Sequence, residues 1–350
     1  MPLIAFVMAC VLALAFTPLS VRLAWAIGFL DHPEARKLHT AATALLGGVV
    51  VFASALAAWW IAIARLGLAA SQSHDEVLAL VSGAAIALVW GLWDDRFGMG
   101  VRLKLLGQVL AASCLILAGV VPDLGWPGPT EAVVTVFLVV ALMNAVNFLD
   151  NMNGMIAGLT AVLMLGFAWG SLQRGAPGLA AAQFALAGAC AGFLPFNFPR
   201  ARTFLGDAGS LLLGYSLGAS AMLAVAGLPP GWGRMGPLIM LLYPAFDLIF
   251  VVINRVREGR PVQQGGKDHS NHRLARLLKC PIRTVMLLWL VGAALCASAL
   301  VAQRLNQAPA TLLLSGAWLV IFLLTGLRLS SVPSQSPVPS APSSAHPSRA

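Results

Sequence analysis

The chain has 350 residues, of which 59% are hydrophobic and only 10% charged, and its formal net charge is +9. A soluble globular domain carries about 25% charged residues, so this composition excludes a water-soluble fold and indicates a polytopic membrane protein. The basic excess does not point to nucleic acid. The Lys and Arg residues lie in short connections between apolar runs, where membrane topology and anionic lipid account for them.

Apolar runs recur along the chain at the length of about 20 residues that a bilayer-spanning helix requires. Because lipid satisfies no backbone hydrogen bond, we expect an all-α polytopic membrane protein with about eleven transmembrane helices. The expected spans are Leu3–Leu30, Leu45–Leu68, Val77–Trp93, Leu103–Val121, Val133–Phe148, Met155–Ser171, Leu179–Phe196, Leu211–Leu228, Met235–Ile253, Val285–Val301 and Thr311–Leu327. Residues 1–329 form one membrane domain in this prediction, and the Ser/Pro-rich residues 330–350 form a disordered tail.

The basic residues also predict an orientation. Most of the 22 Lys and Arg residues follow odd-numbered spans, and the other connections hold only Arg65, Arg174, Arg234 and Arg304. Positive residues are retained on the cytoplasmic side, so we expect the N-terminus outside and the odd-numbered connections in the cytoplasm.

Most of the 13 acidic residues fall at the same cytoplasmic ends, a distribution that the positive-inside rule does not explain. Carboxylates among Lys and Arg at a membrane edge suggest a metal ion and phosphates that share one site. These acidic residues are Asp31, Glu34, Asp94, Asp95, Asp150, Asp207, Asp247, Glu258 and Asp268.

The third expected span ends in Asp94 and Asp95, although a helix C-terminus disfavours negative charge. Compensation by a divalent cation or by basic groups is therefore expected, and Lys104 and Gln108 open the next helix on the same side, within reach of phosphate. A solvated helix end is the alternative interpretation.

Two further polar clusters follow apolar runs. Asn147 and Asp150 share one face if their helix continues, so they could coordinate a metal or bind a base or sugar; a polar turn, which includes Asn153, is the alternative. Asp207 lies near the start of a span among glycines, and Arg202 before it is a candidate phosphate clamp. A simple helix-entry turn is the alternative there.

The last candidates are an acid within the ninth span and two basic loops. Asp247 is costly in a membrane and so a functional candidate, with Arg255 two helical turns away and a structural ion pair as the alternative. His269 and His272 lie in the longest cytoplasmic loop and could bind a diphosphate; a membrane-surface patch is the alternative. A short basic loop near the N-terminus carries Arg36 and Lys37.

From Asp31 to Leu274 the chain resembles the polyprenyl-phosphate N-acetylhexosamine-1-phosphate transferases, the family that includes the muramoyl-pentapeptide translocase. The resemblance rests on these segments in order: D-x-P-x-x-R-K-x-H (31–39), the Asp-Asp pair (94–95) with Lys104 and Gln108, N-x-x-N-x-x-D (144–150), F-x-G-D-x-G-S (204–210), P-x-x-D (244–247) and a His-containing loop (268–273).

The resemblance implies a cytoplasm-facing, Mg²⁺-dependent enzyme (Mn²⁺ as a substitute) of the inner membrane. It transfers an N-acetylhexosamine-1-phosphate, GlcNAc-1-phosphate in the glycan-priming branch, from a UDP-sugar to polyprenyl (undecaprenyl) phosphate and releases UMP. No nucleic acid takes part, and a homo-oligomer is compatible with the pattern.

By resemblance, the catalytic residues are Asp94, Asp95, Asp207, His269 and His272. The metal ligands are Asp207, Asn147 and Asp150. The substrate-binding residues are Arg36, Lys37, Lys104, Asn147, Asp150, Asn153, Arg202 and Arg255.

Three segments depart from the family pattern. Asp150-Asn151-Met152-Asn153-Gly154 replaces D-G-x-D-G, His269-Ser270-Asn271-His272 replaces H-x-H-H, and Ala44 replaces a proline. The alternatives to an active transferase are a catalytically silent homologue and a secondary transporter. A transporter would place ionisable residues near the membrane midplane in two related halves.

Overall fold

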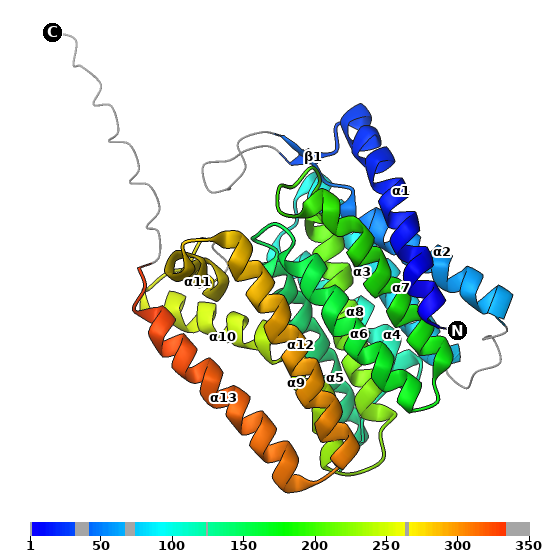
Figure 1. The fold of residues 1–350 in the computed structure, drawn as a ribbon, viewed down its shortest axis with the longest axis vertical. Helices are drawn as coiled ribbons and strands as arrows, with labels where there is room; N and C mark the ends of the chain where they lie inside the picture. The colour runs from blue at the N-terminus through cyan, green and yellow to red at the C-terminus, as the bar shows by residue number, and fades with distance from the viewer. Residues whose placement is uncertain (1, 32–41, 67–73, 124, 263–265, 334–350) are drawn as a thin grey trace.

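The computed structural model describes residues 2–31, 42–66, 74–123, 125–262 and 266–333, and these form an almost entirely helical bundle (Figure 1). The elements are α1 (Leu3–Ile27), β1 (Leu30–Asp31), β2 (Thr43–Ala44), α2 (Gly47–Leu66), α3 (His74–Phe97), α4 (Val101–Leu117), α5 (Gly128–Leu149), α6 (Met155–Gln173), α7 (Pro177–Asn197), α8 (Gly206–Ala226), η2 (Trp232–Met235), α9 (Gly236–Ile239), α10 (Leu242–Arg257), α11 (Ser270–Leu278), α12 (Pro281–Leu305) and α13 (Ala308–Ser330). The two short strands form an antiparallel ribbon that the sequence did not predict.

Among the described residues, nine helices are long and apolar enough to cross a membrane, or ten if the bent pair around α9 and α10 counts as one span. The expected all-α polytopic membrane fold is confirmed. Helix α4 corresponds to the fourth expected span but has only 17 residues. The total of eleven spans and their orientation stay predictions.

The ninth expected span, Met235–Ile253, is not one continuous helix. The segments Trp232–Ile239 and Leu242–Arg257 meet at an angle of 64°. Pro244 explains the break, because a proline ring collides with the carbonyl four residues earlier, which here belongs to Met240. The bend lets α10 leave the bundle and carry Asp247 toward α11 (Figure 1).

Helix α8 is the centre of the bundle, and its apolar span is fully enclosed, whereas α1 and α13 at the edges are mostly exposed. A Cβ at Gly91 of α3 would lie only 2.4 Å from the Cα of Ala208, so the glycine permits α3 to touch the first turn of α8. This contact brings the acidic end of α3 to the N-terminus of α8.

The polar clusters lie at one end of the bundle, where α3 and α5 end and where α4, α8 and α11 begin. A nine-residue helix, α11, occupies part of the segment that the sequence analysis treated as a loop. Helix α13 ends at Ser330, one residue beyond the expected boundary of the membrane domain.

Candidate active site

A lysine joins two carboxylates from different helices at the centre of this polar end. Lys104 Nζ lies 2.8 Å from Asp94 Oδ2 and 3.0 Å from Asp207 Oδ2. The other oxygen of Asp94 accepts the backbone N–H of Met99 at 2.7 Å, which fixes the turn between α3 and α4. Three expected site residues from α3, α4 and α8 therefore meet, as the sequence predicted.

Asp95 caps the start of α8. Its two carboxylate oxygens accept the backbone N–H groups of Asp207 at 2.8 Å and of Ala208 at 3.0 Å. A helix N-terminus has unpaired donors and a partial positive charge, so a carboxylate stabilises it. Gly206 makes the cap possible, because its φ is +70° and an added Cβ would lie 2.5 Å from Asp95 Oδ2. In this arrangement Asp95 orients Asp207.

Amide side chains from α5 complete the lining of this region. The Asn147 side-chain nitrogen donates to Asp207 Oδ1 and, at 2.8 Å, to the hydroxyl of Ser210. Gln108 and Asn144 exchange hydrogen bonds of 3.3 and 2.7 Å between α4 and α5. Asn147 therefore holds Asp207 in place from the side opposite Lys104.

Asp150 lies directly after the last residue of α5. Burial, and secondarily the charge of Asp207, raise the pKa of Asp150 to about 7. We call Asp94, Asp95, Asp150 and Asp207, together with Lys104, the carboxylate centre. Lys104, which contacts Asp94 and Asp207, is the single ammonium group among these four acids, so the centre favours the approach of a cation.

The oxygen chemistry of the carboxylate centre suits Mg²⁺, which is typically held by one or two carboxylates together with substrate phosphates and water. In the described part of the chain, no three His, Cys, Asp or Glu side chains converge closely enough to form a protein-only metal cage. Asn147 presents its amide nitrogen to Asp207, so a role as metal ligand requires its amide to turn over. Asp207 and Asp150 thus fit a magnesium ion that phosphates also bind.

A second polar group joins α10 to α11. Asp247 is fully buried, its Oδ2 lies 2.9 Å from His269 Nδ1, and its Oδ1 accepts the backbone N–H of Ser270 at 2.8 Å. From the sequence, Arg255 was the expected ion-pair partner of Asp247, and the pair with His269 was not predicted. A buried acid requires a partner, and the histidine in the following segment was the available signal.

Arg255 instead binds Asp268. Its Nε and Nη2 lie 2.9 Å from the two oxygens of Asp268, and its Nη1 donates to the carbonyl of Val262. Burial opposes ionisation of Asp268, but the hydrogen bonds and charge of Arg255, with the charge of Arg260, outweigh it and lower the pKa of Asp268 to about 2. The guanidinium of Arg255, which we expected on substrate, is occupied within the protein.

Arg273 connects α11 to the end of the last helix. Its guanidinium donates to the carbonyls of Leu329 and Ser330 at 3.2 Å and of Val332 at 3.0 Å. Carbonyls at a helix C-terminus lack intrahelical partners and attract cations. We call the set Asp247, Arg255, Asp268, His269 and Arg273 the α10–α11 clamp.

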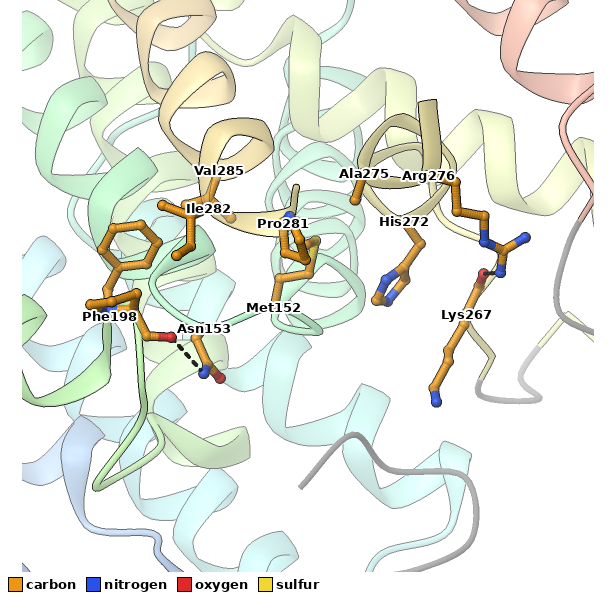
Figure 2. Close-up of a pocket in the computed structure, with 11 residues that line it drawn as sticks. Met152, Asn153, Phe198, Lys267, His272, Ala275, Arg276, Pro281, Ile282 and Val285 are labelled. Atoms are coloured by element: carbon orange, nitrogen blue, oxygen red, sulfur yellow. Dashed lines mark hydrogen bonds between the residues drawn. The ribbon is translucent and has the colours of Figure 1, made fainter. Parts of the chain in front are cut away.

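A pocket of about 340 Å³ lies beside α11 (Figure 2). Its lining comprises Met152, Asn153, Phe198, Pro199, Lys267, His272, Ala275, Arg276, Pro281, Ile282 and Val285. His272 faces it from α11. Burial, and then nearby cationic groups, lower the pKa of His272 to about 4, so its imidazole is neutral at physiological pH. Asn153 faces the pocket from the other side and donates to the carbonyl of Pro199 at 3.1 Å (Figure 2).

The remaining expected residues are not part of the carboxylate centre as described. Arg202 is exposed on the segment between α7 and α8. Arg36 and Lys37 lie outside the described residues. His269 directly precedes α11 and His272 lies in its first turn, and their rings stand 6.2 Å apart between centroids.

The described helices thus form a membrane bundle with a partly exposed group of acids around a lysine at one end, next to a short histidine-bearing helix. The sequence profile of glycosyl transferase family 4 matches residues 77–225, from α3 to α8. A decaprenyl-phosphate N-acetylglucosaminephosphotransferase of Mycobacterium tuberculosis (strain ATCC 25618 / H37Rv) is 32% identical over 300 residues, covering 77% of this chain and 74% of that protein. The chain therefore belongs to this family of polyprenyl-phosphate sugar-phosphate transferases.

Two other relatives place the chain more broadly. A probable undecaprenyl-phosphate N-acetylglucosaminyl 1-phosphate transferase of Bacillus subtilis (strain 168) is 29% identical over 335 residues, covering 92% of this chain and 87% of that protein. A phospho-N-acetylmuramoyl-pentapeptide-transferase of Desulforudis audaxviator (strain MP104C) is 34% identical over 252 residues, covering 63% of this chain and 74% of that protein. The predicted family is confirmed, and the transporter interpretation has no support among these relatives.

Proposed function

We propose that this protein transfers GlcNAc-1-phosphate from UDP-GlcNAc to a polyprenyl phosphate, such as undecaprenyl phosphate, and releases UMP. The observation that carries the proposal is the junction of Asp94, Lys104 and Asp207 at the end of a membrane bundle. One substrate is water-soluble and the other resides in lipid, so the reaction requires a site at the membrane edge. The names of the relatives support the sugar and the lipid class.

The reaction joins two anions, so its main requirement is neutralisation of charge and correct alignment of the phosphates. Lys104 is placed to contact phosphate from one side of Asp207 and to offset the repulsion between Asp94 and Asp207. Asp95 and Asn147 hold Asp207 through the helix cap and the amide hydrogen bond. His269, oriented by Asp247, and His272 contact the diphosphate or sugar from α11.

Magnesium dependence is part of the proposal, with Asp207 and Asp150 as the residues that would hold the ion. When bound, Mg²⁺ would neutralise the negative charge of the donor diphosphate and polarise its bridging oxygen. The acidic excess of the carboxylate centre and the raised pKa of Asp150 support this assignment, because both describe a site where a cation is favoured.

We also propose that the site faces the cytoplasm of a bacterial inner membrane. The excess of Lys and Arg in the odd-numbered connections supports this orientation. UDP-sugars are made in the cytoplasm, which agrees with a donor site on that side.

The experiment is a UMP-release assay on detergent-purified protein with undecaprenyl phosphate, Mg²⁺ and a panel of UDP-N-acetylhexosamines. We expect release that depends on both lipid and divalent cation and that is fastest with UDP-GlcNAc. Release with another donor would correct the sugar. No release from folded protein with any donor would reject the transferase in favour of a catalytically silent homologue.

A further inference from the structure

Two asparagine side chains far apart in sequence connect the segment after α5 to the first turn of α11. Asn271, in the first turn of α11, donates its side-chain N–H to the side-chain oxygen of Asn151 at 2.7 Å. Asn151 lies just beyond the end of α5, next to Asp150. Asn271 is completely buried, so breaking this bond would leave a buried amide unpaired.

The bridge belongs to a longer chain of hydrogen bonds. The Asn151 side-chain nitrogen donates to the carbonyl of Phe148 at 2.8 Å, within the last turn of α5. At the other end, the Asn271 side-chain oxygen accepts the backbone N–H of His272 at 2.7 Å. Both amides thus use a donor and an acceptor, and they connect the helix that carries Asn147 to the backbone of His272.

The residues next to this bridge form opposite walls of the pocket in Figure 2. Met152 and Asn153 follow Asn151 on one side, and His272, Ala275 and Arg276 follow Asn271 on the other. The bridge therefore joins the two backbone segments that carry Asn153 and His272 into the lining of the pocket.

Two other contacts also hold α11 in place. The start of α11 is already anchored to Asp247 through Ser270, and Arg273 anchors the helix to the end of α13. The amide pair adds a third connection of α11, to the segment between α5 and α6.

We propose that Asn151 and Asn271 are a positioning pair that sets the pocket between the α5–α6 segment and α11 to the width of the nucleotide-sugar donor. The inference rests on the proposed function. The wall chemistry suits such a ligand, because Lys267 and Arg276 offer positive charge to phosphates while Asn153 and His272 offer hydrogen bonds to sugar groups.

The test is a double-mutant cycle with Asn151→Ala, Asn271→Ala and the double variant in the full chain. The Kd for UDP-GlcNAc is measured by calorimetry in detergent with Mg²⁺, alongside the Kd for UDP-GalNAc, the melting temperature and lipid-dependent UMP release. We expect each single variant to weaken UDP-GlcNAc binding about tenfold and the double variant to be no weaker than the worse single one. The preference for UDP-GlcNAc over UDP-GalNAc should fall in all three.

Asn254→Ala is the matched control, because Asn254 is a buried amide on α10 that bonds the carbonyl of Phe250 in its own helix. It should lower the melting temperature and leave the donor Kd unchanged. Additive effects on Kd, or a loss of stability with unchanged Kd and donor preference, would overturn the pair as a positioning device.

The outcomes also separate this inference from the proposed function. Coupled loss of donor binding without UMP release from the wild type would reject the transferase reaction and leave the positioning pair standing. Normal turnover with additive effects would reject the pair and leave the reaction standing. Wild-type protein that binds no UDP-sugar would overturn both.

Discussion

The carboxylate centre and the α10–α11 clamp differ in the balance of their acidic and basic side chains. In the carboxylate centre, Asp94 and Asp207 share Lys104, and Asp95 and Asp150 add further acids. In the clamp, Asp247 is paired with His269, and Asp268 is paired with Arg255. The first region therefore holds more carboxylates than positively charged groups, whereas each acid of the second has its own basic partner.

The excess of acids indicates that the carboxylate centre acts on substrates, and the pairing of Arg255 with Asp268 indicates that this part of the clamp fixes the shape of the protein. Unbalanced acids oppose folding and are retained where a ligand supplies the missing charge. Matched buried pairs are costly to break and fix geometry. Substitutions in the carboxylate centre should therefore remove activity from folded protein, and substitutions of Arg255 or Asp268 in the clamp should primarily destabilise it.

The largest expected effect is that of Asp207→Asn. The variant keeps an acceptor for Asn147 but loses the charge that faces Lys104 and the proposed magnesium site. We expect UMP release to fall by about 10³-fold, the scale of losing a central electrostatic group, with a modestly lower melting temperature because Lys104 loses one of its two carboxylate partners. Activity within tenfold of the wild type in folded protein would contradict a catalytic role.

Asp268→Asn should have the largest effect on stability. It leaves Arg255 buried without its charged partner, which costs about 3–5 kcal/mol. Thermal unfolding in detergent measures the loss. The matched control is Glu258→Gln, whose exposed carboxylate pairs with Arg260 and lies 3.5 Å from Arg273, contacts worth about 1 kcal/mol or less. Equal melting temperatures for the two variants would mean that the clamp does not stabilise the fold.

Lys104→Met removes the positive charge from the carboxylate centre. Without the shared ammonium group, Asp94 and Asp207 repel each other, so the metal-free protein should melt at a lower temperature. Added Mg²⁺ should raise the melting temperature of the variant more than that of the wild type, because the ion takes over the missing charge. Arg304→Met, at the last turn of α12, is the control. Identical Mg²⁺ shifts in Lys104→Met and the wild type would argue against a cation site here.

The smallest expected effect concerns pH and His272. Burial, and then nearby cationic groups, lower the pKa of His272 to about 4 from the ordinary 6.5. Below pH 6.5 the unfolded chain binds a proton that the folded protein does not yet accept, so stability is complete above pH 6.5 and declines toward pH 4. Melting temperatures across this range should fall less steeply for His272→Gln. The same slope in both proteins would contradict a buried neutral imidazole.

Most of the helical architecture was predictable because long apolar runs permit only one structure in lipid. The meeting of Asp94, Lys104 and Asp207 was also predictable, since all three lie at span ends on one side. The break before α10 was visible in Pro244 but was missed, because apolar composition continues through it. Helix α11 was missed because it is short and polar.

The partners of the charged residues were not predictable from the chain order. Asp247 could pair with any nearby cation, and only the bend of α10 decides that His269 reaches it while Arg255 turns to Asp268. Asp95 looks like Asp94 in sequence, yet its carboxylate caps α8 because Gly91 and Gly206 bring the two helices into contact. Such outcomes depend on tertiary packing that local patterns do not contain.

The contact between Arg273 and the end of α13 has a consequence for biosynthesis. A ribosome makes α11 before α12 and α13, so in the nascent chain Arg273 lacks the carbonyls of Leu329, Ser330 and Val332. The carboxylate centre can assemble once α8 is inserted, but the helix that carries His269 and His272 acquires its last anchor only after α13 enters the membrane. The order of translation therefore delays the final geometry of the site until all the described helices are in place.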